Sequence, residues 1–594
     1  MNGANSYAGK VLRVDLTTGT ITTELLNETW ARDFIGGKGL GFRYLYAELP
    51  PNTNPLSPAN AVILFTGPLA GTCVATTART VVCTRSPATG TILDSYVGGS
   101  LGAELKFAGY DGLIVTGKAP KPGYLLIRDG EAELRDAAAV WGKGIWDTEN
   151  WLKEQVGDSE LKTIAAGPAG ENLVPFAGLT SEAYRQAGRG GLGAVFGSKN
   201  LKAIAVRGTG GVTVPDMSSF LALYRDIHVN HLLTDDNLWA NTDGTPVIVD
   251  LSQEAGLLPT RGFTQGEFED ATNINAEAIR AAKIRDRACL SCPLACGKLT
   301  RHGDHHMEGP EYETLALTGS NCGIGDLSAV IAFNQRCDDL GLDTISAGNV
   351  VGLAMAMTAE GVHDFGLRFG DIEAYLGVVE DIAFRRGIGA ELAEGARKLA
   401  RKYGGEALAL ENKGLEYPGY DPRGSYGMAL AYATSERGAC HLRSFAVGAE
   451  AFGDIDPFTL EGKAQLVIRD QNHNSVKWTG IFCDFWAIEI ADIAQLIAAA
   501  TGHPYQADEM MTIGERIWNL GRLFNVREGF GRADDYPPPA IFERPLPAGA
   551  AAGKNLVREE YEAALDEYYR LRGWTPEGRP TPEKLKELGL GELA

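Results

Sequence analysis

Three closely spaced cysteines carry the clearest chemical signal in the sequence. Residues 289–297 read CLSCPLACG, which places Cys289, Cys292 and Cys296 in a C-x2-C-x3-C spacing. One short loop with this spacing can turn three thiolates toward a common point. Iron–sulfur clusters are held by cysteine thiolates, four of them in a four-iron cluster. The spacing therefore predicts three cluster ligands and requires a fourth thiolate from elsewhere in the chain.

A structural zinc site is the competing interpretation of this loop. Such sites usually combine one cysteine pair with a second CxxC or a histidine pair at short range. His302, His305 and His306 follow in the stretch RHGDHHMEG, but no second CxxC exists. We therefore favour a cluster, and we expect the three histidines to be solvated loop residues.

The fourth thiolate must come from the six cysteines outside the loop, which are Cys73, Cys83, Cys322, Cys337, Cys440 and Cys483. Cys73, Cys83 and Cys337 lie in or beside apolar strand or helix patterns, where cysteine usually serves as a small core residue. Cys483 lies in a glycine-containing turn among aromatic residues, WTGIFCDF. Aromatic rings would shield a cluster from water, so the residues favour Cys483.

Composition limits the class of protein. The chain has 594 residues and a formal net charge of −21, from 55 Lys and Arg against 76 Asp and Glu. This charge argues against nucleic-acid binding and suits a basic partner or an electron carrier. The N-terminus lacks a cationic start followed by an apolar core, and no apolar run reaches the ~20 residues that span a bilayer. We expect a cytoplasmic protein whose nine cysteines are thiols and metal ligands rather than disulfides.

The first third of the chain reads as β-rich. Alternating apolar residues predict a hairpin over 8–25, and further strands are predicted at 61–67, 80–86, 111–118, 123–130 and 161–166. Two glycine-rich basic loops lie among them: FIGGKGLGFR (34–43), which contains Lys38 and opens a predicted helix over 41–49, and RGGLG (189–193), which begins with Arg189. Two such loops in one domain favour binding of a polyanionic cofactor.

The rest of the chain reads as helical after a glycine-rich linker at 208–215. The predicted helices cover 217–233, 274–284, 326–341, 345–360, 370–386, 388–404, 459–470, 484–501 and 506–528, with an extended surface segment at 530–553 and a charged helix from about 555. The sequence thus predicts an α+β fold: a β-rich domain (1–209) that cradles the cofactor, followed by two mostly α-helical domains (210–412 and 413–594).

Eight ordered blocks of the sequence resemble the aldehyde ferredoxin oxidoreductase family of tungsten enzymes. The blocks are FIGGKGLGFRYLY (34–46), FTGPLAGT (65–72), SYVGGSLGAELKFAGYDGLIVTGKA (95–119), AGRGGLGAVFGSKNLKAIAV (187–206), CLSCPLACG (289–297), GPEYETLALTGSNCGI (309–324), DDLGLDTIS (338–346) and YATSERGACHLR (432–443). The resemblance implies a tungsten bis-pyranopterin cofactor beside a [4Fe-4S] cluster. It also implies oxidation of aldehydes to carboxylic acids, with acid reduction as the reverse reaction.

The resemblance assigns roles to individual residues. Cys289, Cys292 and Cys296 match the family's first three cluster ligands and Cys483 its fourth, and Arg79 matches an arginine between cluster and pterin. Asp94 and Ala187 match positions whose backbone carbonyls hold a Mg²⁺ between the pterin phosphates. The motif DDLGLD, with Asp338, Gly341, Leu342 and Asp343, matches a pterin-binding pattern. By charge, Arg185, Arg189 and Lys38 are expected phosphate partners.

The segment before Cys483 departs from the family. The family has a DxxGLC pattern here, whereas residues 475–483 read SVKWTGIFC, without the aspartate and with one residue more between glycine and cysteine. We expect Cys483 to remain a ligand, with Lys477 or Asp484 helping to hold the second pterin.

Glu311, Glu313 and His441 are the acid–base candidates. The two glutamates share a face if GPEYET is extended and diverge if it is helical. The family places one glutamate and one histidine beside tungsten, and we favour Glu313 as the base and His441 as the hydrogen-bond donor to the aldehyde carbonyl.

Two other functions fit the same motifs. A tungsten-dependent benzoyl-CoA reductase subunit would need a channel for the coenzyme A tail and a cysteine near the metal, and Cys440 beside His441 leaves this open. A non-catalytic electron-transfer or scaffold subunit is disfavoured by the matches at Glu313 and His441. The sequence has no second cluster motif and no convincing nucleotide fingerprint. We therefore expect electrons to pass to ferredoxin or to a small iron–sulfur subunit, with or without a flavin or NAD subunit, in a homo- or hetero-oligomer.

Overall fold

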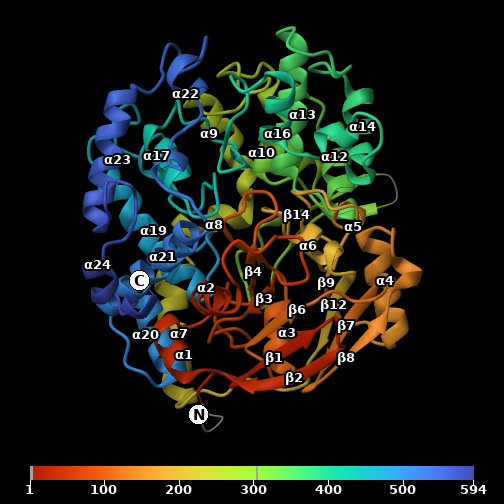
Figure 1. Cartoon of the computed structure of the whole chain (residues 1–594), viewed down its shortest axis with the longest axis vertical. Coiled ribbons are helices and arrows are strands. Elements are labelled where there is room, and N and C mark those ends of the chain that lie inside the picture. The colour runs from red at the N-terminus through yellow and green to blue at the C-terminus, as the bar shows by residue number, and fades with distance from the viewer. Residues whose placement is uncertain (1–4, 303–304, 594) are drawn as a thin grey trace.

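The N-terminal part contains a six-stranded sheet with the order β2-β1-β6-β3-β4-β5. The computed structural model describes residues 5–302 and 305–593 (Figure 1). The strands are β1 (Lys10–Asp15), β2 (Thr20–Leu25), β3 (Val62–Phe65), β4 (Thr80–Arg85), β5 (Ile92–Val97) and β6 (Gly112–Thr116). β1 and β2 form the predicted hairpin, and β1 pairs with β6 in parallel.

A second six-stranded sheet follows with the order β11-β10-β9-β12-β7-β8. Its strands are β7 (Gly123–Arg128), β8 (Glu131–Asp136), β9 (Lys162–Ala166), β10 (Leu179–Ser181), β11 (Arg185–Ala187) and β12 (Leu201–Arg207). Val14, Leu113, Leu125 and Ile164 belong to one buried cluster, so side chains of both sheets share a core. The helices of this part are α1 (Glu28–Phe34), α2 (Gly37–Glu48), α3 (Leu101–Phe107), α4 (Ile145–Val156), α5 (Pro168–Glu171) and α6 (Leu192–Ser198).

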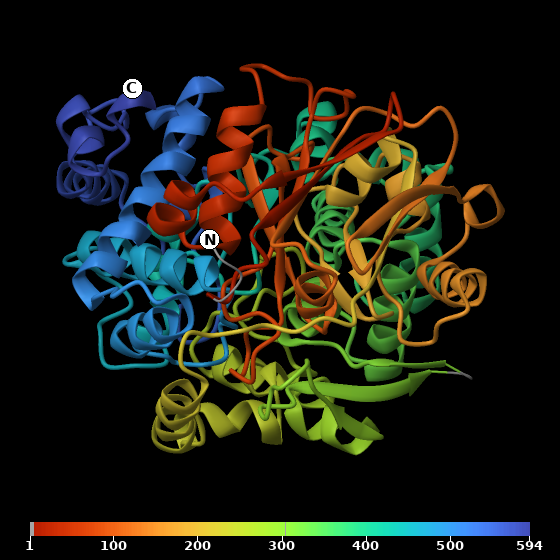
Figure 2. The same ribbon diagram turned by 90° about the horizontal axis from the view of Figure 1, so that it is seen from below.

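Helices dominate the rest of the chain, as predicted (Figures 1 and 2). The middle part contains α7 (Met217–Ile227), α8 (Asp235–Thr242), α9 (Ile248–Glu254), α10 (Ala276–Ala282), α11 (Tyr312–Thr314), α12 (Leu327–Leu340), α13 (Thr344–Ala359), α14 (Ile372–Phe384), α15 (Gly389–Leu392) and α16 (Ala396–Tyr403). The last part contains α17 (Tyr426–Thr434), α18 (Ala446–Ala449), α19 (Lys463–Thr479), α20 (Ile490–Thr501), α21 (Ala507–Arg527), α22 (Ala540–Glu543), α23 (Arg558–Arg572) and α24 (Pro582–Glu587). The α+β fold class is therefore confirmed.

Several local predictions differ from the structure. Helix α2 begins at Gly37, four residues before the predicted start. Gly37 lies against the Trp478 carbonyl, and a Cβ atom at this position would approach that oxygen to 2.2 Å. The helix predicted over 388–404 is broken at Gly395, whose φ of 86° interrupts the helix between α15 and α16. Residues 530–553 are not wholly extended on the surface, because they include α22, whose Ile541 is fully buried.

The histidine-rich stretch after the cysteine loop forms strands rather than a loop. β13 (Arg285–Arg287), β14 (Gly297–His302) and β15 (His305–Glu308) make a three-stranded antiparallel sheet. The backbones of His302 and His305 pair with each other, and His306 is exposed. Local polarity suggested a loop, but the antiparallel pairing of β14 with β15 imposes extended backbone on these residues.

The two helical parts share buried side chains. One apolar cluster joins Val350 and Tyr375 of the middle part to Tyr432 and Tyr568 of the last part. A second cluster joins Phe42 of α2 to helices α20 and α21. The domain limits at 209/210 and 412/413 remain predictions. The parts that they define pack on one another through these two apolar clusters.

Within the described ranges, no single helix has the length and apolar composition to cross a membrane. The bent pair Tyr312–Cys322 and Leu327–Leu340 passes that test by length and composition together, with a bend of 118° between its halves.

Candidate active site

One cavity brings together most of the residues that the sequence singled out. It has a volume of about 700 Å³. The predicted site residues in its wall are Cys289, Cys292, Cys296, Cys483, Arg79, Arg185, Asp338, Asp343, Glu311, Glu313 and His441. They come from the β-rich part and from both helical parts, so the cavity exists only when all three are folded together.

The cysteine loop is closed by the ladder between β13 and β14, in which Arg287 pairs with Gly297. Two non-glycine residues, Ser291 and Ala295, have φ values of 57° and 40°, and these left-handed turns fold the loop back on itself. The Cys289 thiol accepts a hydrogen bond from the Gly99 amide at 3.1 Å, a contact that ties the loop to the β-rich part.

Cys483 lies in the turn after α19 and lines the same cavity as the three cysteines of the loop. Burial is the main cause of the raised pKa of Cys289, Cys292 and Cys296, and the charge of Cys483 raises each of them further. The pKa of Cys292 rises to about 11. Four thiolates in one buried cavity repel one another, so a cationic group between them would stabilise the ionised form.

The cavity wall suits a group larger than one metal ion. Among the described residues, no three His, Cys, Asp or Glu side chains are placed to share a single ion. Arg185 is half-buried, and its buried nitrogen Nη2 has no hydrogen-bond partner, while Nη1 lies 2.9 Å from Glu308 Oε1. A buried donor of this kind requires an acceptor. The donor set therefore fits an iron–sulfur cluster with a polyanionic cofactor beside it.

Glu313 and His441 form a pair in the cavity. His441 Nδ1 lies 3.3 Å from Glu313 Oε1, and neither atom makes a hydrogen bond. Glu313 Oε2 accepts the Gly419 amide at 2.8 Å. Burial raises the pKa of Glu313 to about 8, and burial followed by the charge of Arg189 lowers the pKa of His441 to about 3. The pair is thus a neutral carboxyl next to a neutral imidazole at pH 7.

Glu311 lies in the same wall but has a different environment. It precedes α11, and its carboxylate accepts a hydrogen bond from the Thr245 hydroxyl. Burial and then the neighbouring Glu308 raise its pKa to about 7. Because its backbone is extended and that of Glu313 is helical, the two side chains leave the chain in different directions. Only Glu313 pairs with His441.

The raised pKa of Glu313 predicts a pH dependence. If Glu313 must be ionised to accept a proton, kcat/KM for aldehyde should fall about tenfold per pH unit below the folded-state pKa of about 8. The measurement is a pH–rate profile in buffers of constant ionic strength. The Glu313→Gln variant should lack this limb, and a flat wild-type profile between about pH 6 and pH 8 would contradict the assignment.

The DDLGLD motif joins α12 to α13 at the cavity wall. Asp343 caps α13 by accepting the Ile345 amide at 3.2 Å and the Ser346 amide at 3.1 Å. Asp338 accepts hydrogen bonds from Gln186 and, at 3.2 Å, from Asn334. Burial raises its pKa well above the usual range. Each carboxyl reaches the cavity while local donors hold it in place.

Gly341 and Leu342 shape this turn without lining the cavity. Gly341 has a φ of 74°, and a Cβ atom there would lie 2.8 Å from the Gly167 nitrogen. Leu342 is fully buried and bridges to Ala177. Gly341 therefore permits the close approach of the motif to the β-rich part.

Arg79, Asp484 and Lys477 line the cavity near Cys483. Asp484 accepts Arg79 Nη1 at 3.1 Å and the Trp478 indole at 2.8 Å. Burial alone would raise the pKa of Asp484, but Arg79 and Lys477 bring it below its usual value. Lys477 donates to the Trp486 carbonyl at 2.9 Å. These groups occupy the place where the family's second aspartate pattern is missing.

Four further predicted residues lie outside the cavity wall: Lys38, Asp94, Ala187 and Arg189. Ala187 pairs with Leu179 in β11, and the Asp94 carbonyl accepts Arg437 Nη1 at 2.6 Å. Arg189 donates to the Ala439 and Glu416 carbonyls, both at 2.7 Å, and lies 3.4 Å from Asp343. Arg189 thus contacts the DDLGLD motif at Asp343 from outside the cavity wall.

Lys38 belongs to a buried ionic network instead of the cavity wall. Its ammonium contacts Glu436 and lies 3.6 Å from Asp94, while Arg443 also contacts both carboxylates. All four side chains are essentially inaccessible to solvent. The charge of Lys38 is therefore already neutralised by protein carboxylates, which explains why it does not present an ammonium to the cavity.

Removal of one member of this network should be costly. Lys38→Met leaves two buried carboxylates with Arg443 alone, and it should lower the free energy of unfolding by about 3–5 kcal/mol. Denaturant unfolding followed by fluorescence measures the change. Lys402→Met breaks the exposed pair with Glu391 and should leave the midpoint unchanged. Equal unfolding midpoints for wild type and Lys38→Met would show that the network does not stabilise the folded protein.

Several cavity residues were missed from the sequence. Glu308 precedes the predicted block GPEYET and pairs with Arg185, and the ring of Tyr420 is tilted against that of His441 with centroids 5.5 Å apart. A turn-rich tyrosine stretch, YPGYDPRG, was the only signal for Tyr420. Among the other cysteines, Cys83 and Cys337 are buried as expected, whereas Cys73 is exposed, so its assignment to the core was wrong.

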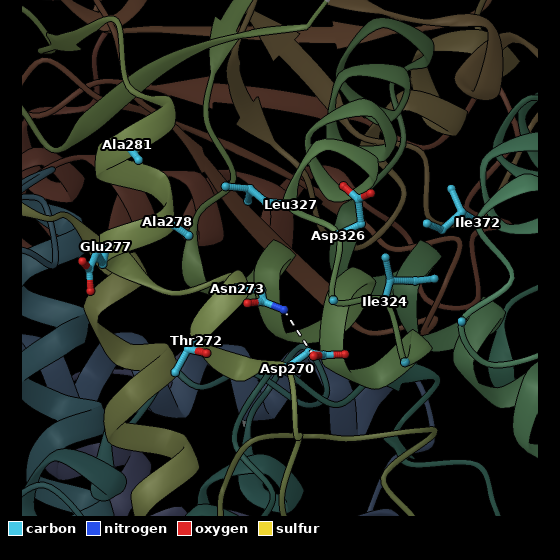
Figure 3. A pocket seen from close by; sticks show the side chains of 13 residues that line it. Asp270, Thr272, Asn273, Glu277, Ala278, Ala281, Ile324, Asp326, Leu327 and Ile372 are labelled. Carbon is cyan, nitrogen blue, oxygen red and sulfur yellow. Dashed lines mark hydrogen bonds between the residues drawn. The ribbon is translucent and has the colours of Figure 1, made fainter.

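A second, open groove of about 820 Å³ lies away from these residues (Figure 3). Two of its acidic side chains are engaged locally: Asp326 caps α12, and Asp270 accepts Asn273 Nδ2 at 3.2 Å, the dashed line in Figure 3. Among the described residues, no cysteine or histidine lines this groove. The first cavity is therefore the candidate active site.

The fold and the four-thiol cavity define a class of redox enzyme, and comparison with known proteins identifies it. Residues 11–208 match the family model "Aldehyde ferredoxin oxidoreductase, N-terminal domain", and residues 224–590 match "Aldehyde ferredoxin oxidoreductase, domains 2 & 3". The chain belongs to the aldehyde ferredoxin oxidoreductase family, and it is an oxidoreductase. This confirms the resemblance carried by the eight sequence blocks.

Two relatives and one solved structure are similar to the chain over nearly its whole length. The chain is 41% identical over 603 residues to a tungsten-containing aldehyde ferredoxin oxidoreductase of Pyrococcus furiosus, with 98% of this chain and 99% of the relative covered. It is 30% identical to the WOR-like subunit of an aliphatic sulfonate oxidoreductase of the same organism, covering 99% and 97%. Among solved structures, the active-site complex BamBC of benzoyl coenzyme A reductase matches with a TM-score of 0.86 at 26% identity, covering 99% of this chain and 98% of that chain.

Proposed function

We propose that this protein oxidises aldehydes to carboxylic acids at a tungsten bis-pyranopterin cofactor. The balanced reaction is RCHO + H₂O → RCOOH + 2 H⁺ + 2 e⁻. The bound cofactor supplies the two-electron redox chemistry and the Lewis acidity, whereas the protein supplies position, proton acceptors and an electron exit. The observation that carries the proposal is the contact between Glu313 Oε1 and His441 Nδ1, two atoms without a hydrogen-bond partner, in the wall of the four-thiol cavity.

His441 and Glu313 divide the acid–base work. A neutral His441 donates a hydrogen bond to the aldehyde oxygen and makes the carbonyl carbon more electrophilic. Ionised Glu313 accepts a proton from water or from the aldehyde hydrate. The low pKa of His441, about 3, keeps the imidazole from taking that proton itself. Glu311 has a hydrogen-bonded carboxylate and serves as a secondary proton acceptor.

The cavity walls suggest which residues hold the cofactors. Cys289, Cys292, Cys296 and Cys483 would bind a [4Fe-4S] cluster, with Arg79 between cluster and pterin. Asp338 and Asp343 would accept hydrogen bonds from one pterin, and Arg185 would donate to an anionic or sulfur acceptor. The carbonyls of Asp94 and Ala187 are proposed Mg²⁺ ligands between the pterin phosphates, and Arg189 and Lys38 support that region from outside the wall.

Electrons would leave one at a time through the cluster. The chain has one cysteine motif of this kind, so a separate acceptor must take both electrons. A ferredoxin, or an iron–sulfur subunit of a larger assembly, is the proposed acceptor, and acid reduction is the reverse reaction when the acceptor pool is reduced.

A second candidate is an aromatic acyl-CoA reductase subunit, because the solved structural neighbour is a benzoyl coenzyme A reductase complex. That chemistry would draw on a cysteine near the metal. Cys440 is buried outside the cavity wall, and its sulfur accepts Arg437 Nη2 at 2.9 Å. This placement favours the aldehyde reaction.

One assay separates the candidates. Purified, tungsten-loaded protein should reduce a viologen dye with acetaldehyde or benzaldehyde and form the matching acid. It should show no activity that converts benzoyl-CoA to a dienoyl product with reduced dye. Turnover of benzoyl-CoA but not of aldehydes would select the second candidate, and turnover of neither would indicate a non-catalytic subunit.

A further inference from the structure

We propose that a small, acidic iron–sulfur protein docks on a basic face formed by β13 and the cysteine loop, residues 284–291 together with Arg301. This docking face rests on the proposed function, because it assumes that electrons leave through the four thiolates. It goes beyond that function by stating where the electron acceptor binds and which charges recognise it.

The charge of this segment is opposite to that of the whole chain. The protein carries a net charge of −21, which by itself would repel an acidic partner. Residues 280–301 contain one carboxylate, Asp286, against six cationic side chains: Arg280, Lys283, Arg285, Arg287, Lys298 and Arg301. Because this segment is positively charged and the protein as a whole is negative, an acidic partner would approach with its negative surface toward this segment.

Three of these arginines make no ion pair with a neighbouring carboxylate of the described residues. Arg280 pairs with Asp243 at 2.5 Å, while Lys283 and Lys298 pair with Asp286 at 2.9 and 3.0 Å. In the part of the chain that the structure describes, Arg285, Arg287 and Arg301 make no ion pair. Arg285 and Arg301 are exposed, and Arg287 is half-buried with its guanidinium 4.3 Å from the ring centroid of Tyr184.

The face also carries apolar side chains in water. Ile284 is 49% exposed and Leu290 is 39% exposed. Apolar side chains surrounded by charged ones resemble a protein–protein interface, with a desolvated centre and a polar rim. Figure 2 shows the yellow-green chain of this region along the lower edge of the molecule.

The position of the face gives it a function. β13 ends two residues before Cys289, and Leu290 lies between Cys289 and Cys292 in the loop. A partner that contacts Leu290 is therefore separated from two proposed cluster ligands by little more than one side chain. A bound cluster would supply one electron to the oxidised cluster of the partner in each encounter, so the two electrons from one aldehyde would require two encounters.

The test combines binding with kinetics. The probe is a purified, strongly acidic [4Fe-4S] ferredoxin. Arg285→Glu/Arg301→Glu is compared with wild type, and Arg401→Glu on α16 is the matched control, because Arg401 is also exposed and without an ion pair among the described residues. Kd is measured by calorimetry at low and high salt. The KM for ferredoxin and the KM for methyl viologen are measured with the same aldehyde.

At low salt the double variant should raise Kd and the KM for ferredoxin about tenfold, and the difference should shrink at high salt. Arg401→Glu should change neither, and viologen reduction should stay at the wild-type rate in both variants. Unchanged ferredoxin binding in the double variant, or an equal loss in Arg401→Glu, would overturn the docking face. If wild type failed to reduce viologen with aldehyde, the proposed function would be refuted. The Kd values from calorimetry would still show whether ferredoxin binds at the docking face.

Discussion

Glu313→Gln is expected to lower kcat for aldehyde oxidation on the order of 10²–10⁴-fold, the range that general-base catalysis supplies. The amide has nearly the same shape, so the hydrogen bond from the Gly419 amide can be retained. It cannot accept a proton as the carboxylate does, and its Oε1 position still faces His441 Nδ1. The loss should therefore appear in kcat, measured by viologen reduction at saturating aldehyde, with tungsten and iron content unchanged.

Glu311→Gln provides the matched control two residues away. Its carboxylate already accepts the Thr245 hydroxyl and does not contact His441, so its kcat should fall less than that of Glu313→Gln. The reverse order of the two variants would identify Glu311 as the base. A change of less than about tenfold in both would show that neither glutamate accepts the proton.

Cys483→Ala is expected to cost most of the bound iron and to lower dye-coupled activity on the order of 100-fold or more, as losses at metal sites typically do. Cys483 is the thiol that comes from the last part of the chain, so its loss would also remove the connection that a bound cluster would make between the turn after α19 and the cysteine loop. Iron and acid-labile sulfide per chain, together with the cluster's visible absorption, measure the effect.

Cys73→Ala is the corresponding control, because Cys73 is exposed and does not line the cavity. It should keep the wild-type iron content and activity. A Cys483→Ala protein with full iron and an unchanged cluster spectrum would show that the fourth ligand is a different residue.

The features that sequence predicted best are those that local chemistry determines. The spacing of Cys289, Cys292 and Cys296 required a loop that closes on itself, and the ladder between β13 and β14 closes it. Alternating apolar residues likewise predicted the β1–β2 hairpin. In each case the determining interactions lie within a few residues.

The features that sequence missed depend on contacts between distant segments. Lys38 and Glu436 are nearly four hundred residues apart, so the glycine-rich loop alone suggested a free phosphate partner. The pairing of Arg185 with Glu308 and of Glu313 with His441 likewise joins separate parts of the chain. The basic docking face was hidden by the overall charge, because a sum over the chain does not record where the arginines lie.

The central claim is that the four-thiol cavity holds a tungsten pterin beside an iron–sulfur cluster. Elemental analysis of active, purified protein tests it most directly, with tungsten, molybdenum, iron and sulfide measured on one sample. The account predicts about one tungsten and about four iron atoms per chain. Protein that oxidises aldehydes at full rate while containing neither tungsten nor molybdenum would contradict it.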